Sequence, residues 1–228
     1  GNAAGTVQFA PGGTTYQTTV TGNSTNGYST TVTAFTPTGT TTTTLVGQPY
    51  DAVRIAPDGT AYQTTVTGDS TNGYYTHVTA MTTAQPSTMI PGRPPMLAYS
   101  SLQFAADGTI YQTTFTGDDP NANSYLITTI TPTGTAITRP LTGIVVSGIQ
   151  VAPDGTAYQT TATDDGTGNY TYYIAATTPA GVTTTTTIVG TPTDVVYLAP
   201  DGSVLQTVNV GNNVTQIVVI KRAGTTIV

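Results

Sequence analysis

The chain has 228 residues, of which only 7% are charged, and its net charge of −6 arises from 11 acidic residues, all aspartate, against five lysines and arginines. This acidic balance argues against nucleic acids and anionic membrane surfaces as partners, because both require a basic footprint on the protein. Cysteine is absent, which excludes disulfides, thiol catalysis and cysteine-ligated metals. No apolar run approaches the roughly 18 residues that span a bilayer.

The residue types favour β-strands. Threonine occupies 57 positions, a quarter of the chain, and valine, isoleucine and tyrosine are also frequent. Such β-branched and aromatic side chains suit a pleated, half-buried surface, whereas strong helix formers are scarce and no helical stripe is present. Disorder is the competing interpretation. However, 25 glycines and 15 prolines make 40 residues in 228, which is below the roughly 25–30% of low-complexity chains.

A ten-residue segment recurs five times along the chain. Its clearest copy is Ala56–Thr65, and the other copies begin at Ala10, Ala105, Ala152 and Ala199. The glycine in its fourth position lies at residues 13, 59, 108, 155 and 202, so successive copies are 46, 49, 47 and 47 residues apart. Tandem repetition at this period is the signature of a repeat architecture.

Each repeat predicts four strands. In the second repeat, strand a is expected over Ala52–Ala56, strand b over Thr60–Thr67, strand c over Tyr74–Thr82 and strand d over Ser87–Ile90. The Pro-Asp-Gly turn between strands a and b combines a preset proline φ with a glycine that accepts positive φ. Four short antiparallel strands in each unit of about 47 residues are typical of a β-propeller blade. We therefore predict an all-β, five-bladed β-propeller whose blades close into a ring.

The predicted propeller is a single domain over residues 6–228, with blades at about 6–48, 49–97, 98–144, 145–192 and 193–228. The strand-Pro-Asp-Gly-Thr-strand start of each unit resembles the repeats of NHL and YVTN-type bacterial propellers. The Thr-rich composition of Ala56–Thr65 resembles repeat regions of secreted or surface proteins from mycobacteria and related actinobacteria. This resemblance implies a secreted or cell-surface location and no particular site residues. We also expect the chain to be a domain of a longer protein, because it starts almost directly on a strand.

Two recurrent side chains in strand b are interpreted as structural. A glutamine in each unit is expected to bond to loop backbone or to the adjacent blade: Gln17, Gln63, Gln112, Gln159 and Gln206. The aromatic residue before it is expected to fill the space between blades: Tyr16, Tyr62, Tyr111 and Tyr158, with Leu205 in the fifth unit.

The innermost strands predict a polar channel. Their aligned middle positions are Gln8, Arg54, Gln103, Gln150 and Tyr197. One interpretation is a channel wall solvated by water. The other is a site for an anion or a small polar ligand held by Arg54, because a guanidinium group binds a carboxylate with two hydrogen bonds.

Connectivity assigns the a–b and c–d turns to one face and the b–c and d–a loops to the other. Asp58, Asp107, Asp154 and Asp201 in the tight a–b turns are predicted turn formers. The b–c loops resemble calcium loops superficially, but they lack the EF-hand spacing and a glutamate, so polar hairpin loops are the alternative. The weak calcium candidates are Asp69, Asp118, Asp119, Asp164 and Asp165. No cofactor is predicted.

The d–a loop after the second blade departs from the rest of the chain. Met89–Tyr99 concentrates methionine, proline, arginine and tyrosine, residue types that are common at protein interfaces. We predict Arg93, Met96 and Tyr99 as partner-binding residues. The alternative is a loop that folds over the channel mouth and is buried within the domain.

Few residues are suited to catalysis. The one histidine, His77, lies inside strand c and is interpreted as structural, and a glycosidase-like pair would have to consist of Asp51 and Asp194 in non-adjacent blades. We therefore predict a monomeric, non-enzymatic binding or scaffolding module that recognises a protein partner through the b–c and d–a loops. A carbohydrate-binding propeller is the alternative.

Overall fold

The computed structural model describes residues 2–3, 7–82, 84, 86–95, 102–116, 124–211, 214–221 and 224–227, with residues 2–3, 221 and 224–227 described by their backbone alone. Four residues named above lie outside this set: Met96, Tyr99, Asp118 and Asp119. All regular structure in the described residues is β-strand. Among these residues, no helix has the length and apolarity to cross a membrane.

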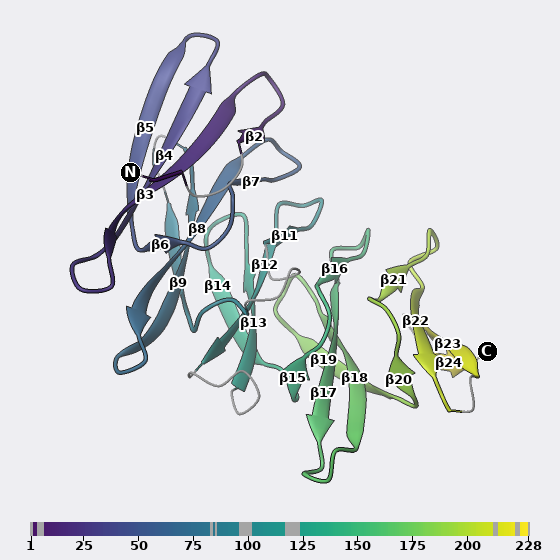
Figure 1. Cartoon of the computed structure of the whole chain (residues 1–228). Helices are drawn as coiled ribbons and strands as arrows, with labels where there is room; N and C mark the ends of the chain where they lie inside the picture. The colour runs from purple at the N-terminus through teal and green to yellow at the C-terminus, as the bar shows by residue number, and fades with distance from the viewer. Residues whose placement is uncertain are drawn as a thin grey trace.

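The strands form five antiparallel sheets that follow one another along the chain, and we refer to them as blades 1 to 5 (Figure 1). Blade 1 contains β1 (Asn2–Ala3), β2 (Gln8–Phe9), β3 (Thr15–Asn23), β4 (Gly27–Thr36) and β5 (Gly39–Val46). Blade 2 contains β6 (Gln48–Pro49), β7 (Arg54–Ile55), β8 (Ala61–Asp69), β9 (Gly73–Ala80) and β10 (Ser87–Pro91). Blade 3 contains β11 (Gln103–Phe104), β12 (Ile110–Thr116), β13 (Ser124–Ile130) and β14 (Ala136–Pro140).

Blades 4 and 5 repeat the same plan. Blade 4 contains β15 (Ile144–Val145), β16 (Gln150–Val151), β17 (Ala157–Asp164), β18 (Tyr170–Thr177) and β19 (Thr183–Ile188). Blade 5 contains β20 (Thr191–Pro192), β21 (Tyr197–Leu198), β22 (Val204–Asn209), β23 (Thr215–Lys221) and β24 (Gly224–Ile227). The all-β class with repeated antiparallel sheets of four strand positions is therefore confirmed, and the five sheets fit the predicted five blades.

Strand positions b, c and d agree closely with the prediction, but the innermost strand does not. In blade 2 it consists of two short pieces, β6 and β7, which both pair with β8. The expectation of one continuous strand over Ala52–Ala56 is wrong because the chain bulges out of the ladder between these pieces. The carbonyl oxygen of Asp51, within the bulge, accepts a 2.8 Å hydrogen bond from the Gln63 side chain instead.

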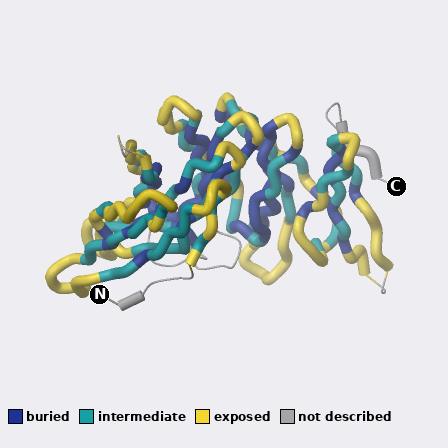
Figure 2. Tube along the Cα trace, turned by 90° about the horizontal axis from the view of Figure 1, so that it is seen from above, coloured by how far each residue is buried: buried dark blue, intermediate teal, exposed yellow. Residues whose placement is uncertain are grey.

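The blades are arranged as an open arc. Figures 1 and 2 place blade 1 and the N-terminus at one end, and blade 5 and the C-terminus at the other. Our expectation of a closed ring is therefore wrong for this structure, because the rotation between neighbouring blades does not sum to a full turn over five blades. Phe9 of blade 1 is 76% exposed and Tyr197 of blade 5 is 67% exposed, in keeping with uncovered ends.

The hydrophobic core lies between blades rather than in one central mass. Val32 of blade 1 packs with Val53 and Ala61 of blade 2, and the interface of blades 4 and 5 buries Ile174 against Val204. At the interface of blades 3 and 4, a larger cluster contains Tyr111, Phe115 and Ile127 with Ile149 and Ala157. The expectation that the strand-b tyrosines fill the spaces between blades is confirmed for Tyr16, Tyr62, Tyr111 and Tyr158, which all belong to such clusters.

Three of the five recurrent glutamines, Gln63, Gln159 and Gln206, join neighbouring blades, as predicted. In blade 4 the buried Gln159 accepts a 2.8 Å hydrogen bond from Thr113 of blade 3 and donates one of 2.9 Å to the Ser147 carbonyl in its own bulge. The same inter-blade bond joins Thr18 to Gln63 and Thr160 to Gln206. Buried amides are costly unless they are paired, and this arrangement pairs both ends of each side chain.

A glycine marks the passage from one blade to the next. Gly47 has φ +101 and Gly143 has φ +78, and a Cβ atom at either position would lie within 2.6 Å of a carbonyl oxygen on strand b of the following blade. Only glycine meets both requirements without a shift of backbone. Gly92 and Gly190 occupy the corresponding positions before blades 3 and 5.

Candidate functional site

The two ends of the blades differ in the way that connectivity predicts. In Figure 1 the b–c loops of blades 1, 2 and 4 project at one end, which we call the loop face, and the short a–b turns project at the opposite end, the turn face. The antiparallel ladders require this separation because successive connections alternate between the two ends of a sheet.

The aspartates of the turn face form turns, as predicted. The carboxylate of Asp58 accepts a 2.8 Å hydrogen bond from the backbone N–H of Thr60, two residues later. The corresponding carboxylates in the next three blades accept the same bond from Thr109, Thr156 and Ser203. These side chains stabilise the tight turns in the manner of an Asx turn; the turn is Ala-Asp-Gly in blade 3 and Pro-Asp-Gly in blades 2, 4 and 5.

The loop face is shaped by the same chemistry. Asp69 accepts hydrogen bonds from the backbone N–H groups of Thr71 and Asn72, and Asn23 plays this part in blade 1. In blade 4 the side chain and backbone of Thr167 both donate to Asp165. These hydrogen bonds stabilise the anions, so the pKa of Asp69 is lowered and the pKa of Asp165 is lowered to about 2.

The calcium candidates divide into two groups. Asp69, Asp164 and Asp165 all accept backbone N–H bonds within their own loops. Asp118 and Asp119 lie outside the described residues, so their part in a calcium site stays a prediction. In the portion of the chain that the structure describes, no group of three or more acidic or histidine side chains is placed to hold a metal ion.

The predicted channel residues occupy equivalent positions on the innermost strands. Each pairs with the residue before the recurrent glutamine of its own strand b, as Arg54 does with Tyr62. Gln8, Arg54, Gln103 and Gln150 are half-buried, whereas Tyr197 stands at the open end of the arc and is exposed. Anion binding by Arg54 stays a prediction.

Arg93 lies in the contact between blades 2 and 3. The backbone N–H groups of Arg93 and of Phe115 in β12 each donate a hydrogen bond to the carbonyl oxygen of the other residue. Its guanidinium carbon lies 4.4 Å from the ring centroid of Tyr74 in blade 2 and 4.9 Å from that of Phe115 in blade 3. The side chain is half-buried between these rings, so Arg93 has a packing role that residue type alone did not indicate.

The residues considered for catalysis are each engaged locally. The Nε2 atom of His77 lies 2.9 Å from the Thr67 hydroxyl, and burial lowers the pKa of His77, which favours the neutral ring. The Asp51 carboxylate accepts a hydrogen bond from the next backbone N–H, that of Ala52, and Asp194 does the same with Val195. Asp51 and Asp194 occupy equivalent bulges in blades 2 and 5.

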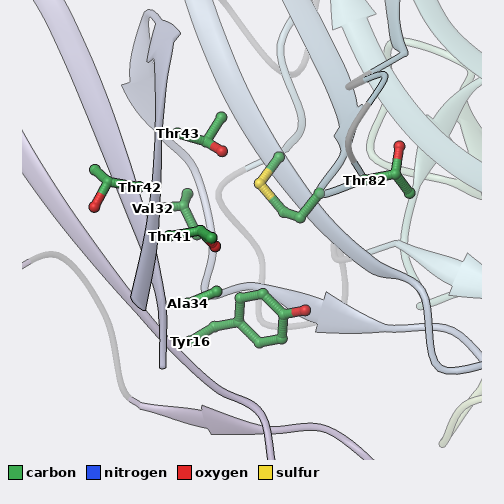
Figure 3. Close-up of a pocket in the computed structure, with 8 residues that line it drawn as sticks. Tyr16, Val32, Ala34, Thr41, Thr42, Thr43 and Thr82 are labelled. Atoms are coloured by element: carbon green, nitrogen blue, oxygen red, sulfur yellow. The ribbon is translucent and has the colours of Figure 1, made fainter. Parts of the chain in front are cut away.

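Sequence reasoning did not identify a cleft between blades 1 and 2, with a volume of about 260 Å³. In Figure 3, Tyr16, Val32 and Ala34 form one part of its lining and Thr82 lies across from Thr41–Thr43 of β5. A smaller cleft of about 100 Å³ recurs between blades 2 and 3, where Tyr62, Val78 and Ala80 take the equivalent places. The alignment of the repeats matches Tyr16, Val32 and Ala34 with Tyr62, Val78 and Ala80, and this match could have indicated the two clefts from the sequence.

Comparison with known proteins supports the fold alone. The sequence matches no family model and no curated protein. Solved structures with similar folds include the β-propeller domain of the trilobed protease from Pyrococcus furiosus, at 10% identity and a TM-score of 0.55, over 99% of this chain and 71% of that one. Acylaminoacyl peptidase from Pyrococcus horikoshii matches 94% of this chain and 38% of its own, at 10% identity and a TM-score of 0.52. Virginiamycin B lyase from Staphylococcus aureus is 16% identical over 99% of this chain and 69% of its own, with a TM-score of 0.45.

Proposed function

We propose that the chain is a non-catalytic binding or scaffolding module that recognises a protein partner through its loop face. One observation carries this proposal. Each aspartate that the structure describes accepts a backbone N–H bond within its own turn, loop or bulge: Asp51, Asp58, Asp69, Asp107, Asp154, Asp164, Asp165, Asp194 and Asp201. Carboxylates that accept such bonds fix the backbone of a turn, loop or bulge, whereas a general acid or base needs a carboxyl group directed at a substrate.

Pre-shaped loops favour recognition because binding then orders fewer groups. The b–c loops of blades 1, 2 and 4 are exposed, yet side-chain caps fix their backbones at Asn23, Asp69 and Asp165. Loop ordering is one of the main entropic costs of association, so a capped loop retains more of its contact energy as affinity.

We also propose a secreted or cell-surface location and an actinobacterial type of NHL or YVTN-like repeat. This part of the proposal is supported by the repeat motif and its Thr-rich composition, together with the propeller fold. This location implies that the loop face meets its partner outside the cell.

Charge-introducing variants on opposite faces test the recognition surface. The loop-face variant is Ser24→Lys with Ser70→Lys, two exposed positions in the b–c loops of blades 1 and 2. The matched control is Ala106→Lys with Ala180→Lys, two exposed positions in turns of the opposite face. Both pairs add the same charge, and surface changes of this kind usually alter stability by less than about 0.5 kcal/mol.

The partner recovered by proximity labelling at the native cell surface should bind the control as well as the unmodified protein and bind the loop-face variant more weakly. The opposite order would reject the loop face as the recognition surface. Turnover of any substrate by the purified protein, lost on Asp51→Asn or Asp194→Asn, would reject the non-catalytic assignment and support the remote alternative of a glycosidase-like enzyme.

A carbohydrate-binding propeller is the second candidate. Tyr170 and Tyr75 stand at the loop-face ends of their strands and are 48% and 41% exposed. The Tyr170 ring lies 6.2 Å from that of Tyr172, which makes a small aromatic surface of the kind that stacks on sugar rings. A glycan array separates the two candidates: saturable glycan binding that is abolished by Tyr170→Ala would favour the carbohydrate function.

A further inference from the structure

The blade interface has a direction that is repeated along the chain. At three internal interfaces, a strand-b threonine of one blade donates its hydroxyl hydrogen bond to the strand-b glutamine of the next, over 2.8–2.9 Å. At these three interfaces one blade presents a donor face to the following blade, and the following blade presents an acceptor face to the preceding one; the interface of blades 2 and 3 lacks this bond, because the Gln112 amide oxygen accepts none from the described residues.

Apolar side chains follow the same direction. On the acceptor faces, the second residue of the inner strand packs against the preceding blade, as Phe104 does against the Tyr62 ring at 5.6 Å. Ile55, Val151 and Leu198 hold this position in blades 2, 4 and 5 and belong to the inter-blade clusters. The first residue of strand b lies beside it and is buried: Ala61, Ile110, Ala157 and Val204 are at most 3% exposed.

Blade 1 has the same acceptor face, and none of the described side chains of another blade covers it. Phe9 takes the place of Ile55 and Phe104, but it is 76% exposed. Phe35, paired across the sheet with Thr15, is 43% exposed. Among the hydrogen bonds of the described residues, the side chain of Gln17 takes part in none, although it aligns with the buried Gln63 and Gln159.

Blade 5 has the complementary donor face. Thr207 aligns with the donors Thr113 and Thr160, and within the described residues its hydroxyl makes no hydrogen bond. Ile217, its cross-strand partner, is 47% exposed, and Leu205 with its partner Val219 is half-buried on the same side of the sheet.

We propose that the donor face of blade 5 in one copy of the chain binds the acceptor face of blade 1 in a second copy, head to tail. The Thr207 hydroxyl then donates to the Gln17 amide oxygen, and Phe9 and Phe35 pack against Leu205 and Ile217. The occupant is a second copy because each end face needs the other's pattern of donor, acceptor and apolar groups, while Figures 1 and 2 place the two faces of one copy at opposite ends of the arc. This inference replaces the expected monomer and is independent of the loop face.

Such a contact uses two different surfaces, so it generates closed rings or open filaments rather than an isologous dimer. The net charge of −6 opposes association of two copies through long-range repulsion, and salt screens that repulsion. We therefore expect the average mass to rise with both protein concentration and ionic strength.

Two single substitutions block one face each. Phe9→Asp places a charge on the acceptor face, and Ile217→Asp places one on the donor face; both positions are exposed, so the fold is retained. In sedimentation velocity, each variant should be monomeric alone, whereas an equimolar mixture should form a heterodimer and nothing larger, because only one compatible pair of faces remains. Val182→Asp, at a 57% exposed position in a turn of blade 4, is the matched control and should associate like the unmodified protein.

A subtler variant tests the register. Thr207→Val keeps the shape of the donor face and removes the hydroxyl, so it should weaken association about fivefold. A protein that stays monomeric at every concentration and salt level would overturn the proposal, and intramolecular ring closure would give that result. Association unaffected by Phe9→Asp and Ile217→Asp, or a mixture of the two variants that remains monomeric, would also overturn it.

Discussion

The hydroxyl of Tyr111 in blade 3 donates a 2.6 Å hydrogen bond to the carbonyl oxygen of Gly155 in the Pro-Asp-Gly turn of blade 4. Tyr111 is fully buried, so this bond joins a core side chain of one blade to a surface turn of the next. The bond gives the Tyr111 hydroxyl a role that a phenylalanine of nearly the same volume would not have.

Replacing Tyr111 by phenylalanine should lower the free energy of unfolding by about 1–3 kcal/mol, because the Gly155 carbonyl loses its donor. Tyr16→Phe is the matched control: the described residues offer the Tyr16 hydroxyl no hydrogen bond, and the change should be nearly neutral. Urea unfolding measures both. Equal effects of the two substitutions would show that ring packing alone matters at this position.

The same tyrosine predicts a pH dependence. Burial, with the Asp107 and Asp154 carboxylates nearby, raises the pKa of Tyr111 above its ordinary value of 10.0. The unfolded chain therefore releases this proton at lower pH than the folded chain does, so the contribution of Tyr111 to stability is present below about pH 10 and is lost as the pH rises beyond it. Thermal unfolding should show a smaller alkaline loss of stability in Tyr111→Phe than in the unmodified protein. An identical loss in both would contradict this pKa shift.

The recurrent glutamines allow a comparison within one chain. Gln159→Leu removes an amide that bonds both Thr113 and the Ser147 carbonyl, and it should destabilise the protein by at least about 2 kcal/mol. Gln17→Leu makes the same change where no inter-blade bond exists and should stay within about 0.5 kcal/mol at low protein concentration. A similar loss at both positions would mean that the glutamine stabilises its own strand rather than the interface.

The sequence predicts the features that each repeat determines locally. Alternating threonine and apolar residues indicate strands b, c and d, and Pro-Asp-Gly indicates the turns that Asp58 and its equivalents cap. A glutamine in every unit predicted ties between blades, and three of the five, Gln63, Gln159 and Gln206, form them. The crossover glycines, Gly47 and Gly143 among them, recur about once per repeat and were available from the spacing as well.

Other features depend on contacts between units. The bulge between β6 and β7 forms where the Gln63 side chain captures the Asp51 carbonyl, a pairing across strands that composition does not reveal. Arg93 is flanked by Tyr74 and Phe115, which come from two different blades. The open arc depends on the angle at every interface, which side-chain packing sets and the length of the repeat does not.

Asp165 provides a prediction at low pH. Its pKa is lowered to about 2, chiefly by the Thr167 hydroxyl and backbone N–H and by the Asn169 side chain. Because the pKa of Asp165 is lower in the folded than in the unfolded chain, its carboxylate stabilises the folded protein at pH values above its ordinary pKa of 3.8. This contribution is lost as the pH falls towards 2. Carboxyl NMR titration should find the Asp165 midpoint near pH 2 and find it raised in Thr167→Val. A midpoint near 3.8 in the unmodified protein would show that the loop is not capped in solution.

The calcium interpretation predicts a shift in melting temperature that we do not expect to see. A calcium ion at 100 times its Kd would stabilise the protein by about 2.7 kcal/mol, which corresponds to a shift of several degrees. Because Asp69, Asp164 and Asp165 accept hydrogen bonds from their own loops, we expect equal melting temperatures in calcium and in EDTA. A calcium-dependent rise that disappears in Asp118→Asn with Asp119→Asn would assign the site to the b–c loop of blade 3.

The Arg93–Tyr99 segment can be separated into a packing part and a recognition part. Arg93→Ala should destabilise the protein by about 1–2 kcal/mol, because the guanidinium group is partly desolvated between the Tyr74 and Phe115 rings. Arg93→Lys should recover part of that loss, since the ammonium group keeps the charge but not the planar stacking.

Met96→Ala with Tyr99→Ala is predicted to leave the melting temperature nearly unchanged and to weaken binding of the partner by about 2 kcal/mol or more if these residues are hot spots. A double variant that unfolds would instead show that the segment is a structural plug. One that folds and binds normally would move recognition to the b–c loops, where Ser24→Lys with Ser70→Lys tests it directly.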